Sequence, residues 1–308
     1  MRFVLFLLAV CFLSSIFHPT SLAQSVTSDR ERREAAWEAW VTVENDRDAT
    51  VPRRIEAINH ELSTIGEHVW AGVYESGMPL GDFITVRIAP KCGVSLTSFG
   101  CCGEGPPNCG QLKMDELGIR LHWDFPGRSN SPLPEILIPI RWGDSLFLID
   151  QIEILQFCID ARAYSRKVDA KAQCRRLATR YLWRSKDRVL PSGKPDIPTA
   201  YQKYEEMPHI VATIASQQQL TRRPVYDHLL GHEFIEQRIT IDVGEESHVL
   251  PGMQFWSPQK FLYVVTAVRD KDSDAVRVEK AIHKPDFPEE IIGDRVSTES
   301  PFDRVAPE

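Results

Sequence analysis

Strict alternation of apolar and polar residues over short runs is the feature of this chain that most constrains its fold. The runs Ile84–Ile88 and Ile119–Phe125 both alternate in this way, and turn-forming residues such as Glu75-Ser76-Gly77 separate the runs. A period of two is typical of strands that bury one face, because successive side chains point to opposite sides of a sheet. We therefore expect residues 69–165 to form an antiparallel α+β domain, as a meander or partial barrel.

The chain after residue 205 has a second β pattern. Short strands joined by tight turns are typical of a small barrel, which we expect over residues 206–284. The last segment, residues 285–308, is rich in proline and acidic residues and is expected to be a C-terminal tail. The candidate strands of this barrel are residues 210–215, 239–243, 253–256, 261–268 and 275–279.

Helices are expected at the N-terminus and between the two β domains. In residues 24–68, a capping-box spacing and an early proline predict two short helices, with a break at Asn45–Ala49 and a second start near Pro52. Glu153–Tyr164 is expected to be a helix that ends the first domain. Residues 166–205 are expected to be a basic helix, from about Val168 to Arg184, followed by a Pro-rich linker.

The first 23 residues have the organisation of a secretory signal. A basic Arg2 precedes the apolar run Phe3–Leu13, and Ser21-Leu22-Ala23 forms a small-x-small cleavage site. We expect cleavage near Ala23 and an exported protein, periplasmic or extracellular. No later apolar stretch is long enough to cross a bilayer, so no transmembrane segment is expected in the mature chain.

Six of the seven cysteines would remain after cleavage. An even number in an oxidising compartment favours disulfides, with the first four paired among themselves and the last two paired together. A zinc site is the alternative, but the spacing contains no Cys-x-x-Cys pair. The disulfide candidates are Cys92, Cys101, Cys102, Cys109, Cys158 and Cys174.

The charge distribution bears on the class of partner. The net charge is −7, which argues against a nucleic-acid-binding protein, but ten Lys or Arg residues lie between Arg162 and Arg188. The basic helix could therefore bind a protein or an anionic envelope polymer, or it could pair with the chain's own acidic regions. The predicted binding surface consists of Lys167, Lys171, Arg175, Arg176, Arg180 and Arg184.

A second candidate site lies on the polar faces of the first domain's strands. If the sheet curls, four of these side chains could line a cleft; if the sheet stays open, they are solvated positions. The four are Arg87, Arg120, His122 and Asp124.

Two patterns resemble metal sites, but neither is complete, so no metal or cofactor is expected. His228 and His232 are four residues apart beside Glu233 and Glu236, which suits either a metal on a helix or a solvated loop. The acidic run Asp270–Asp274 begins like a calcium loop but lacks its glycine and its final glutamate, so a polar hairpin turn is favoured.

Several motifs resemble those of known families. Trp70-Ala71-Gly72, Arg141-Trp142-Gly143-Asp144 and Phe157-Cys158 are similar to motifs of a family of exported bacterial proteins of uncharacterised function. Ile239–Gly244, Pro251–Phe255 and the final Gly293-Asp294-Arg295 resemble the small β-barrel module of the rod-shape scaffold MreC and of flagellar and envelope assembly proteins. The first resemblance implies no activity, and the second implies a surface for partner contacts. The four cysteines from 92 to 109 and an inserted segment at 163–174 depart from the family pattern.

Motifs of common enzyme classes are missing from the sequence. It contains no nucleophile elbow, phosphate-binding glycine loop, dinucleotide fingerprint, kinase set or Cys-x-x-Cys redox pair. We therefore expect an exported, non-enzymatic binding or scaffold protein associated with the bacterial envelope. The alternative is a secreted hydrolase that acts on an envelope polymer, with its site in the first domain.

Overall fold

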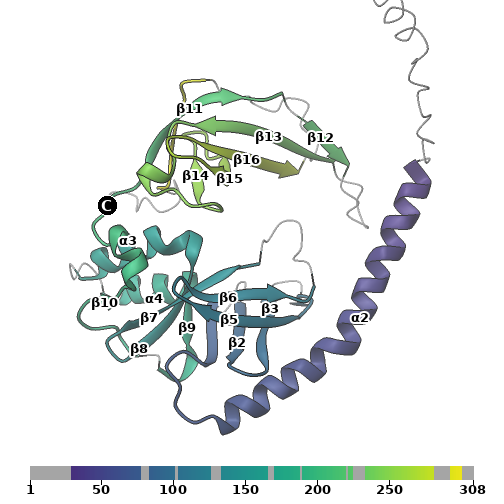
Figure 1. The fold of residues 1–308 in the computed structure, drawn as a ribbon, viewed down its shortest axis with the longest axis vertical. Coiled ribbons are helices and arrows are strands. Elements are labelled where there is room, and N and C mark those ends of the chain that lie inside the picture. Colours follow the sequence, from purple (N-terminus) through teal and green to yellow (C-terminus); the bar gives the residue numbers. More distant parts are fainter. Residues whose placement is uncertain are drawn as a thin grey trace, which may run out of the picture. The chain divides into compact units, whose positions relative to one another are not determined.

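The computed structural model describes residues 29–77, 83–100, 103–125, 133–165, 170–187, 189–219, 221–224, 233–280 and 292–299. The chain divides into two compact units, residues 1–42 and residues 43–308. The second unit contains all of the described strands, and the architecture below belongs to it. It is β-rich α+β, with two closed antiparallel barrels, as expected from the sequence (Figure 1).

Helix α2 (Asp29–Thr64) is one continuous helix, so the predicted break at Asn45–Ala49 is wrong (Figure 1). Tertiary packing supports this stretch, because the Arg47 guanidinium lies 5.3 Å from the centre of the Phe125 ring. Pro52 lies inside the helix, where it removes one backbone donor without ending the helix. Val51 and Ile58, which are seven residues apart and share one helix face, are completely buried.

Eight strands close the first barrel in the order β7-β6-β5-β3-β2-β1-β9-β8, and β7 pairs with β8 to complete the ring. β4 pairs with β3 and β10 pairs with β7 outside this ring. The strands of this sheet are β1 (Gly72–Gly77), β2 (Phe83–Ala89), β3 (Gly93–Gly100), β4 (Gly103–Glu104), β5 (Asn108–Asp115), β6 (Gly118–Trp123), β7 (Ile136–Trp142), β8 (Ser145–Asp150), β9 (Leu182–Arg184) and β10 (Pro195–Asp196).

Apolar side chains fill the first barrel and also cover part of its outside. Val86, Ile119 and Leu137 belong to a buried cluster contributed by β1–β3 and β6–β8. Strands β7 and β8 contribute buried side chains on both faces. Leu137 and Leu146 face the barrel interior. The next residues along the strands, Ile138 and Phe147, belong to a second buried cluster beneath the helices. This second cluster also holds helix residues, so it attaches the helical layer to the barrel.

The helical layer follows β8 and differs from the prediction at its C-terminal end. α3 confirms the expected helix, but α4 stops at Arg180 and the next residues form β9, which inserts between β1 and β8. The predicted linker is packed rather than free, because β10 pairs with β7 and Tyr201 and Tyr204 are buried. The helical elements are η1 (Gln151–Glu153), α3 (Ile154–Ser165), α4 (Ala170–Arg180), η2 (Ser185–Asp187) and η3 (Thr199–Tyr204).

Six strands close the second barrel in the order β11-β17-β14-β15-β16-β13, with β12 added outside the ring on β13. The five predicted strands are all present. β17, however, lies within the segment predicted to be the acidic tail, where Val296 is buried opposite Ala212. The elements are β11 (Val211–Gln217), β12 (Thr221–Pro224), β13 (Glu233–Ile241), η4 (Glu245–Ser247), β14 (Gln254–Trp256), β15 (Leu262–Val268), β16 (Ser273–Lys280) and β17 (Arg295–Ser297).

The acidic run Asp270–Asp274 lies at the turn between β15 and β16, which confirms the predicted hairpin. Arg269 donates hydrogen bonds to the carboxylates of Asp272 and Asp274. The bond from Arg269 lowers the pKa of Asp274 below its usual value. Within the described part of the chain, no helix is both long enough and apolar enough to span a membrane.

Candidate functional site

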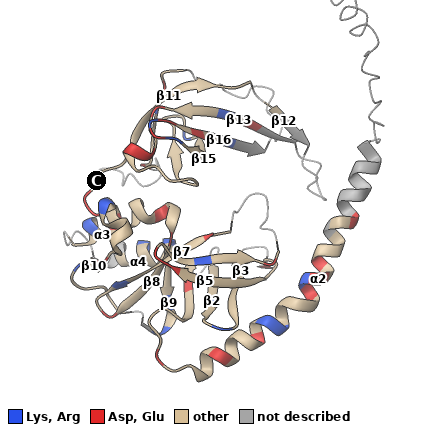
Figure 2. Cartoon of the chain, in the orientation of Figure 1, with Lys and Arg blue, Asp and Glu red and all other residues tan. Residues whose placement is uncertain are grey.

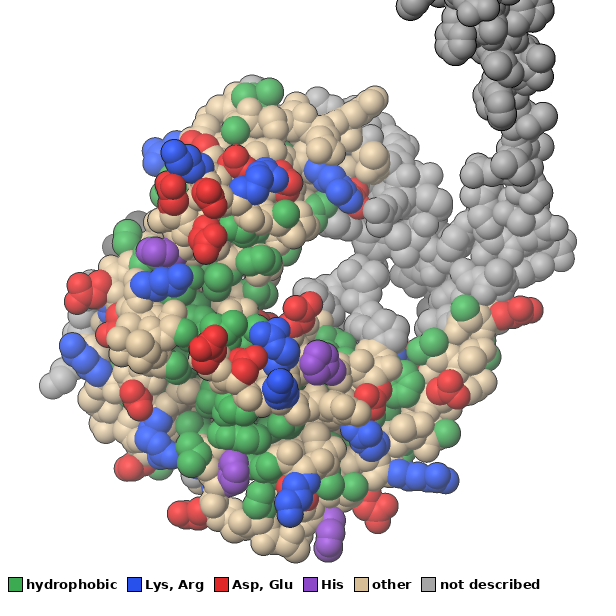
Figure 3. Space-filling model, viewed as in Figure 1, with side chains coloured by type: hydrophobic (Ala, Val, Ile, Leu, Met, Phe, Trp, Pro, Cys, Tyr) green, Lys and Arg blue, Asp and Glu red, His purple; other side chains and the backbone are tan. Residues whose placement is uncertain are grey.

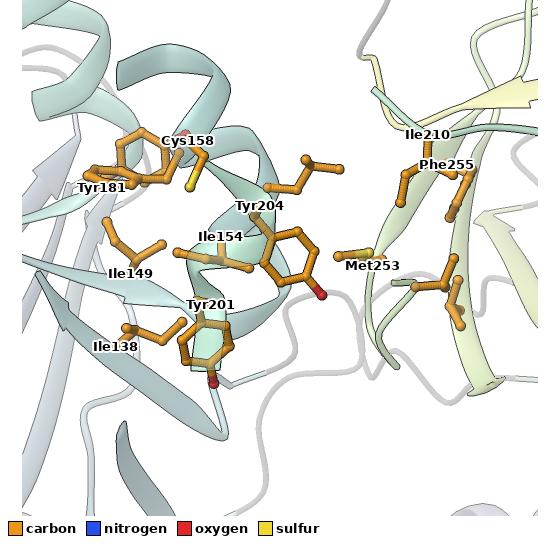
Figure 4. Packing of buried hydrophobic residues seen from close by; sticks show 14 of the residues in the cluster. Ile138, Ile149, Ile154, Cys158, Tyr181, Tyr201, Tyr204, Ile210, Met253 and Phe255 are labelled. Carbon is orange, nitrogen blue, oxygen red and sulfur yellow. The ribbon is translucent and has the colours of Figure 1, made fainter. Parts of the chain in front are cut away.

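The candidate site is the joint at which the helical layer of the first barrel meets the second barrel. A single buried cluster contains Ile138 and Ile149 of the first barrel, Ile154 of α3, and Met253 and Phe255 of the second barrel (Figure 4). Burial of apolar area contributes roughly 25 cal/mol per Å². A cluster shared in this way couples the two barrels, so neither can separate without exposing apolar side chains to water.

Close backbone approach is a second feature of the joint. Gly252 has a φ of +86°, and a Cβ at this position would lie 2.5 Å from Cγ2 of Ile152 in η1. The Tyr204 hydroxyl donates a hydrogen bond of 2.9 Å to the His248 carbonyl of the second barrel. Gly252 belongs to the motif Pro251–Phe255, in which the sequence suggests a close approach between strands of one barrel. In the structure, Gly252 also makes room for Ile152 of η1.

Arg162 of α3 holds the segment that leads from the helical layer into the second barrel. Its guanidinium donates to three backbone acceptors close together in sequence, the carbonyls of Tyr204, Glu205 and Met207, the last at 2.6 Å. Guanidinium donors in a fixed fork suit such clustered acceptors, whereas an ammonium group offers a single point of charge. This role of Arg162 is not visible in the sequence, because an arginine at the end of a helix has no pattern that reveals its backbone partners.

We expect Arg162→Lys to lower the free energy of unfolding by about 2 kcal/mol, because most of these charge-assisted bonds would be lost. Proteolysis should become faster at residues 204–207 before it does so elsewhere. Urea denaturation and mass mapping of the first cleavage would measure the two effects. Arg175→Lys, on the exposed face of α4, is the matched control and should change neither.

A polar cluster joins α3 to α4. The Asp160 carboxylate is buried and accepts hydrogen bonds from Gln156 at 3.0 Å and from the Tyr181 hydroxyl at 2.8 Å. Arg176 forms an ion pair with the same carboxylate at 3.2 Å, and Arg180 pairs with Glu153 at 3.1 Å. The buried Asp160 carboxylate and the partly exposed Glu153 carboxylate therefore both have partners within the joint, as a buried charge requires.

Two clefts flank α3. One has a volume of about 280 Å³ and lies between α3, the β10 segment and the residues after η3. It is lined by Cys158, Ala161, Arg162, Ser165, Lys194, Pro195, Ile197, Glu205 and Glu206. The other lies between the two barrels and is lined by Ile152, Glu153, Leu155, Gln156, Arg180, Met253, Gln254, Trp256 and Thr298. Both combine apolar walls with a few charged groups, which is the composition of binding clefts in general.

Asp150 is a titratable group at the joint that the sequence did not reveal. It ends β8, and its carboxylate accepts a hydrogen bond from the backbone N–H of Ile152 as the N-cap of η1. Burial, together with the nearby charges of Glu153 and Glu135, raises its pKa to about 7. Asp150 thus titrates close to neutral pH beside the residue that meets Gly252.

The predicted basic surface is not one surface in the structure. Arg184 is in β9 rather than on the helix, is buried, and donates to the His68 carbonyl at 3.0 Å. Arg176 and Arg180 bind the acidic partners described above, and Arg175 is exposed. Lys167 and the side chain of Lys171 lie outside the described residues. Basic and acidic residues are interspersed over the described elements, as Figures 2 and 3 show.

The curling of the sheet does not bring the predicted cleft residues together. Arg87, on the outer side of β2, donates to the Thr97 hydroxyl at 3.2 Å. Arg120 and His122 lie on β6, where Arg120 pairs with Asp115 at 3.2 Å and His122 is exposed. β3 and β5 separate these two strands in the barrel, and the alternate residues of β2 and β6 fill its interior.

Asp124, the fourth predicted cleft residue, belongs to the seam between α2 and the first barrel. It accepts a hydrogen bond from the Cys109 thiol at 3.3 Å and lies 3.8 Å from the Arg54 guanidinium. Arg54 also donates to the Gly110 carbonyl at 3.1 Å, and Glu61 accepts from the backbone N–H of Cys92 at 2.7 Å. These charged residues fasten the helix to the barrel, so Asp124 has a structural role here.

Cys92, Cys109, Cys158 and Cys174 are free thiols, so the predicted disulfide between Cys158 and Cys174 is wrong for this structure. Cys158 lines the cleft beside Arg162, whereas the Cys174 thiol lies near Tyr164. Burial raises the pKa of Cys158 to about 12, and burial with the bond to Asp124 raises that of Cys109 to about 11. Cys101 and Cys102 lie outside the described residues.

The raised pKa values predict unreactive thiols in the folded protein. At pH 8 only about one in a thousand Cys109 side chains and about one in ten thousand Cys158 side chains would be thiolates, the form that alkylating reagents attack. We expect iodoacetamide to modify Cys109 and Cys158 only after unfolding in urea. The half-buried Cys92 and Cys174 should be modified at lower urea concentrations. Peptide mass mapping measures the order. Cysteines that resist alkylation after unfolding until a reductant is added would instead be disulfide-bonded.

His228 and His232, whose spacing suits either a metal or a solvated loop, lie outside the described residues, while Glu233 and Glu236 belong to β13. In the parts of the chain that the structure describes, no three His, Cys, Asp or Glu side chains are grouped so that they could hold a metal ion. Comparison with known proteins gives no match to any family model, to any curated protein or to any solved structure. The family resemblance therefore rests on the quoted motifs alone, and the joint between the barrels is identified by its geometry.

Proposed function

We propose that this protein is an exported, non-enzymatic binding or scaffold protein of the bacterial envelope. The observation that carries the proposal is the buried cluster shared by the two barrels. A joint made of apolar packing, backbone approach and charge-assisted bonds favours two binding surfaces held at a fixed spacing. A fixed distance between two binding surfaces is useful to a scaffold protein that holds two partners together. An enzyme whose active site lies in one domain does not need it.

The filling of the first barrel supports the same proposal. Its interior holds side chains such as Val86, Ile119 and Leu137, as in small barrels without a ligand cavity. The rival function, a hydrolase that acts on an envelope polymer, was expected to unite Arg87, His122 and Asp124 in one cleft. These residues instead have separate neighbours on different strands, which favours a binding protein.

The test uses the full chain in its native host, with photo-crosslinking amino acids placed at exposed apolar positions of each barrel. Phe99 on β3 and Val211 on β11 are 54% and 45% exposed. We expect the mature protein to begin after Ala23 and to form a discrete crosslinked product from at least one position. The product should be lost when Gly252→Val disturbs the joint, and should survive the double substitution R87A/H122A.

Two outcomes would overturn the proposal. An uncleaved protein in the cytosol would contradict export. Accumulation of uncut envelope polymer in R87A/H122A, with no effect of Gly252→Val on the crosslinked product, would favour the hydrolase instead.

A further inference from the structure

The loop between α2 and β1 contains a histidine whose hydrogen bonds require one protonation state. His68 Nδ1 lies 3.1 Å from the backbone nitrogen of Ala71 and 3.3 Å from that of Trp70. Both nitrogens are donors, so Nδ1 must accept and must carry no proton. The neutral imidazole, protonated at Nε2, is therefore the form that fits this loop.

The same loop is fastened to the strand that closes the first barrel. Arg184 of β9 donates to the carbonyls of His68 at 3.0 Å and of Ala71 at 3.5 Å. The stem of Arg184 packs on Gly72, where an added Cβ would lie 2.9 Å from Cδ of the arginine. His68 and Arg184 thus bind the same short stretch of backbone. The imidazole accepts from backbone N–H groups, and the guanidinium donates to backbone carbonyls.

This stretch lies beside one of the shortest seams of the barrel. β9 pairs with β1 through only two register positions, Tyr74 with Arg184 and Glu75 with Trp183. By comparison, β1 and β2 pair over six positions from Gly72 to Gly77. Because so few backbone hydrogen bonds hold β9 against β1, the hydrogen bonds from the Arg184 side chain supply a large share of the attachment between the two strands.

We propose that His68 and Arg184 form a pH-sensitive latch across the β1–β9 seam, which is closed while His68 is neutral and loosened when the imidazole takes up a proton. A protonated Nδ1 is a donor and would face two N–H donors. Ala71 is 4% exposed, so its N–H could not turn to water without local opening. The latch goes beyond the proposed binding function and does not depend on it.

Arg184 and Glu67 are the charged residues beside the latch. Arg184 is the charged side chain that faces the loop from β9, and an arginine stays protonated between pH 7.5 and pH 5. Glu67, next to His68, is exposed. The ring of Trp70 lies edge-on to the imidazole, with ring centres 4.6 Å apart, so opening of the loop would also release an indole that packs against the barrel core.

Amide hydrogen exchange of the mature full chain tests the latch. After correction for intrinsic exchange rates, we expect protection at Ala71 and Trp70 to fall about tenfold or more between pH 7.5 and pH 5, as the loss of a buried hydrogen bond implies. Imidazole ¹⁵N shifts in the same samples report whether His68 is the Nε2–H tautomer or the imidazolium. Amides in the β13–β16 ladder should keep their protection.

Two variants make the test specific. His68→Asn keeps a side-chain oxygen that can accept from the same N–H groups but does not titrate, so its protection should not depend on pH. His60→Asn, on an exposed face of α2, should behave as the wild type does. Unchanged protection at Trp70 and Ala71 between pH 7.5 and pH 5 would overturn the latch, as would a His68→Asn variant with the full pH response. If His68→Asn does not fold, the wild-type titration decides alone.

Discussion

Gly252→Ala is expected to lower the free energy of unfolding by about 3 kcal/mol, because strain and overpacking act together at one position. The new Cβ would lie 2.5 Å from Cγ2 of Ile152, and the φ of +86° disfavours any residue with a side chain. Ile152 cannot move aside easily, since branching at Cβ restricts its rotamers. Urea denaturation followed by far-ultraviolet circular dichroism measures the change.

Two controls separate the strain from the clash. Gly193→Ala has a similar φ of +75° with no atom within 4 Å of the added Cβ, so it should cost only about 1 kcal/mol. In an Ile152→Ala background the nearest remaining atom would be Cβ at 3.6 Å, and Gly252→Ala should cost about as little as Gly193→Ala. An equal cost of Gly252→Ala in both backgrounds would mean that the two barrels do not meet at this point.

Stability should fall as the pH rises from about 4 to above 7, and Asp150 is the expected cause. Its pKa is raised to about 7 in the folded protein, against about 3.9 in an unfolded chain. Between these two pH values the unfolded state releases a proton that the folded state retains, so a rise in pH favours the unfolded state. The stabilising contribution of the Asp150 carboxyl is therefore full below pH 4 and is lost as the pH rises through 7. The contribution amounts to up to about 4 kcal/mol.

Asp150→Asn isolates this effect, because asparagine can still cap η1 but does not ionise. We expect the difference in unfolding free energy between variant and wild type to grow in favour of the variant from pH 4.5 to pH 8.5. Urea denaturation at steps of half a pH unit measures it. Asp196→Asn, an exposed carboxylate in β10, is the control and should track the wild type. A constant difference across this range would show that Asp150 ionises normally.

The sequence predicted the β architecture well, because the relevant signal is local. Alternating residues such as Ile119 and Leu121 are buried in the first barrel, and all five candidate strands of the second barrel are present. Burial of one strand face leaves a period of two in the sequence whatever its partner strand is. The helix α3 and the hairpin turn at Asp270–Asp274 were also predicted from local signals: the helical spacing of apolar residues and a polar run between two strands.

Elements whose conformation depends on distant contacts were predicted less well. The apolar spacing of Ile55, Ile58, Leu62 and Ile65 predicts the packed face of α2, but only Ile58 of these four is fully buried. The contacting stripe is instead partly charged, since Arg54 and Glu61 bind backbone groups of the barrel. Hydrophobic periodicity does not detect a helix face that packs through ion pairs and hydrogen bonds, because it depends on apolar residues alone.

The sequence by itself thus determined where most of the strands form and that they make two β domains, since each strand records the burial of its own faces. Only the tertiary structure decided that residues 182–184 close the first barrel, and that Gly252 meets Ile152, one hundred residues away. It also decided that Arg162 holds the carbonyls after η3 and that Asp150 titrates near neutral pH. Such features depend on which distant groups become neighbours, and a contact between distant residues leaves no period in a single sequence.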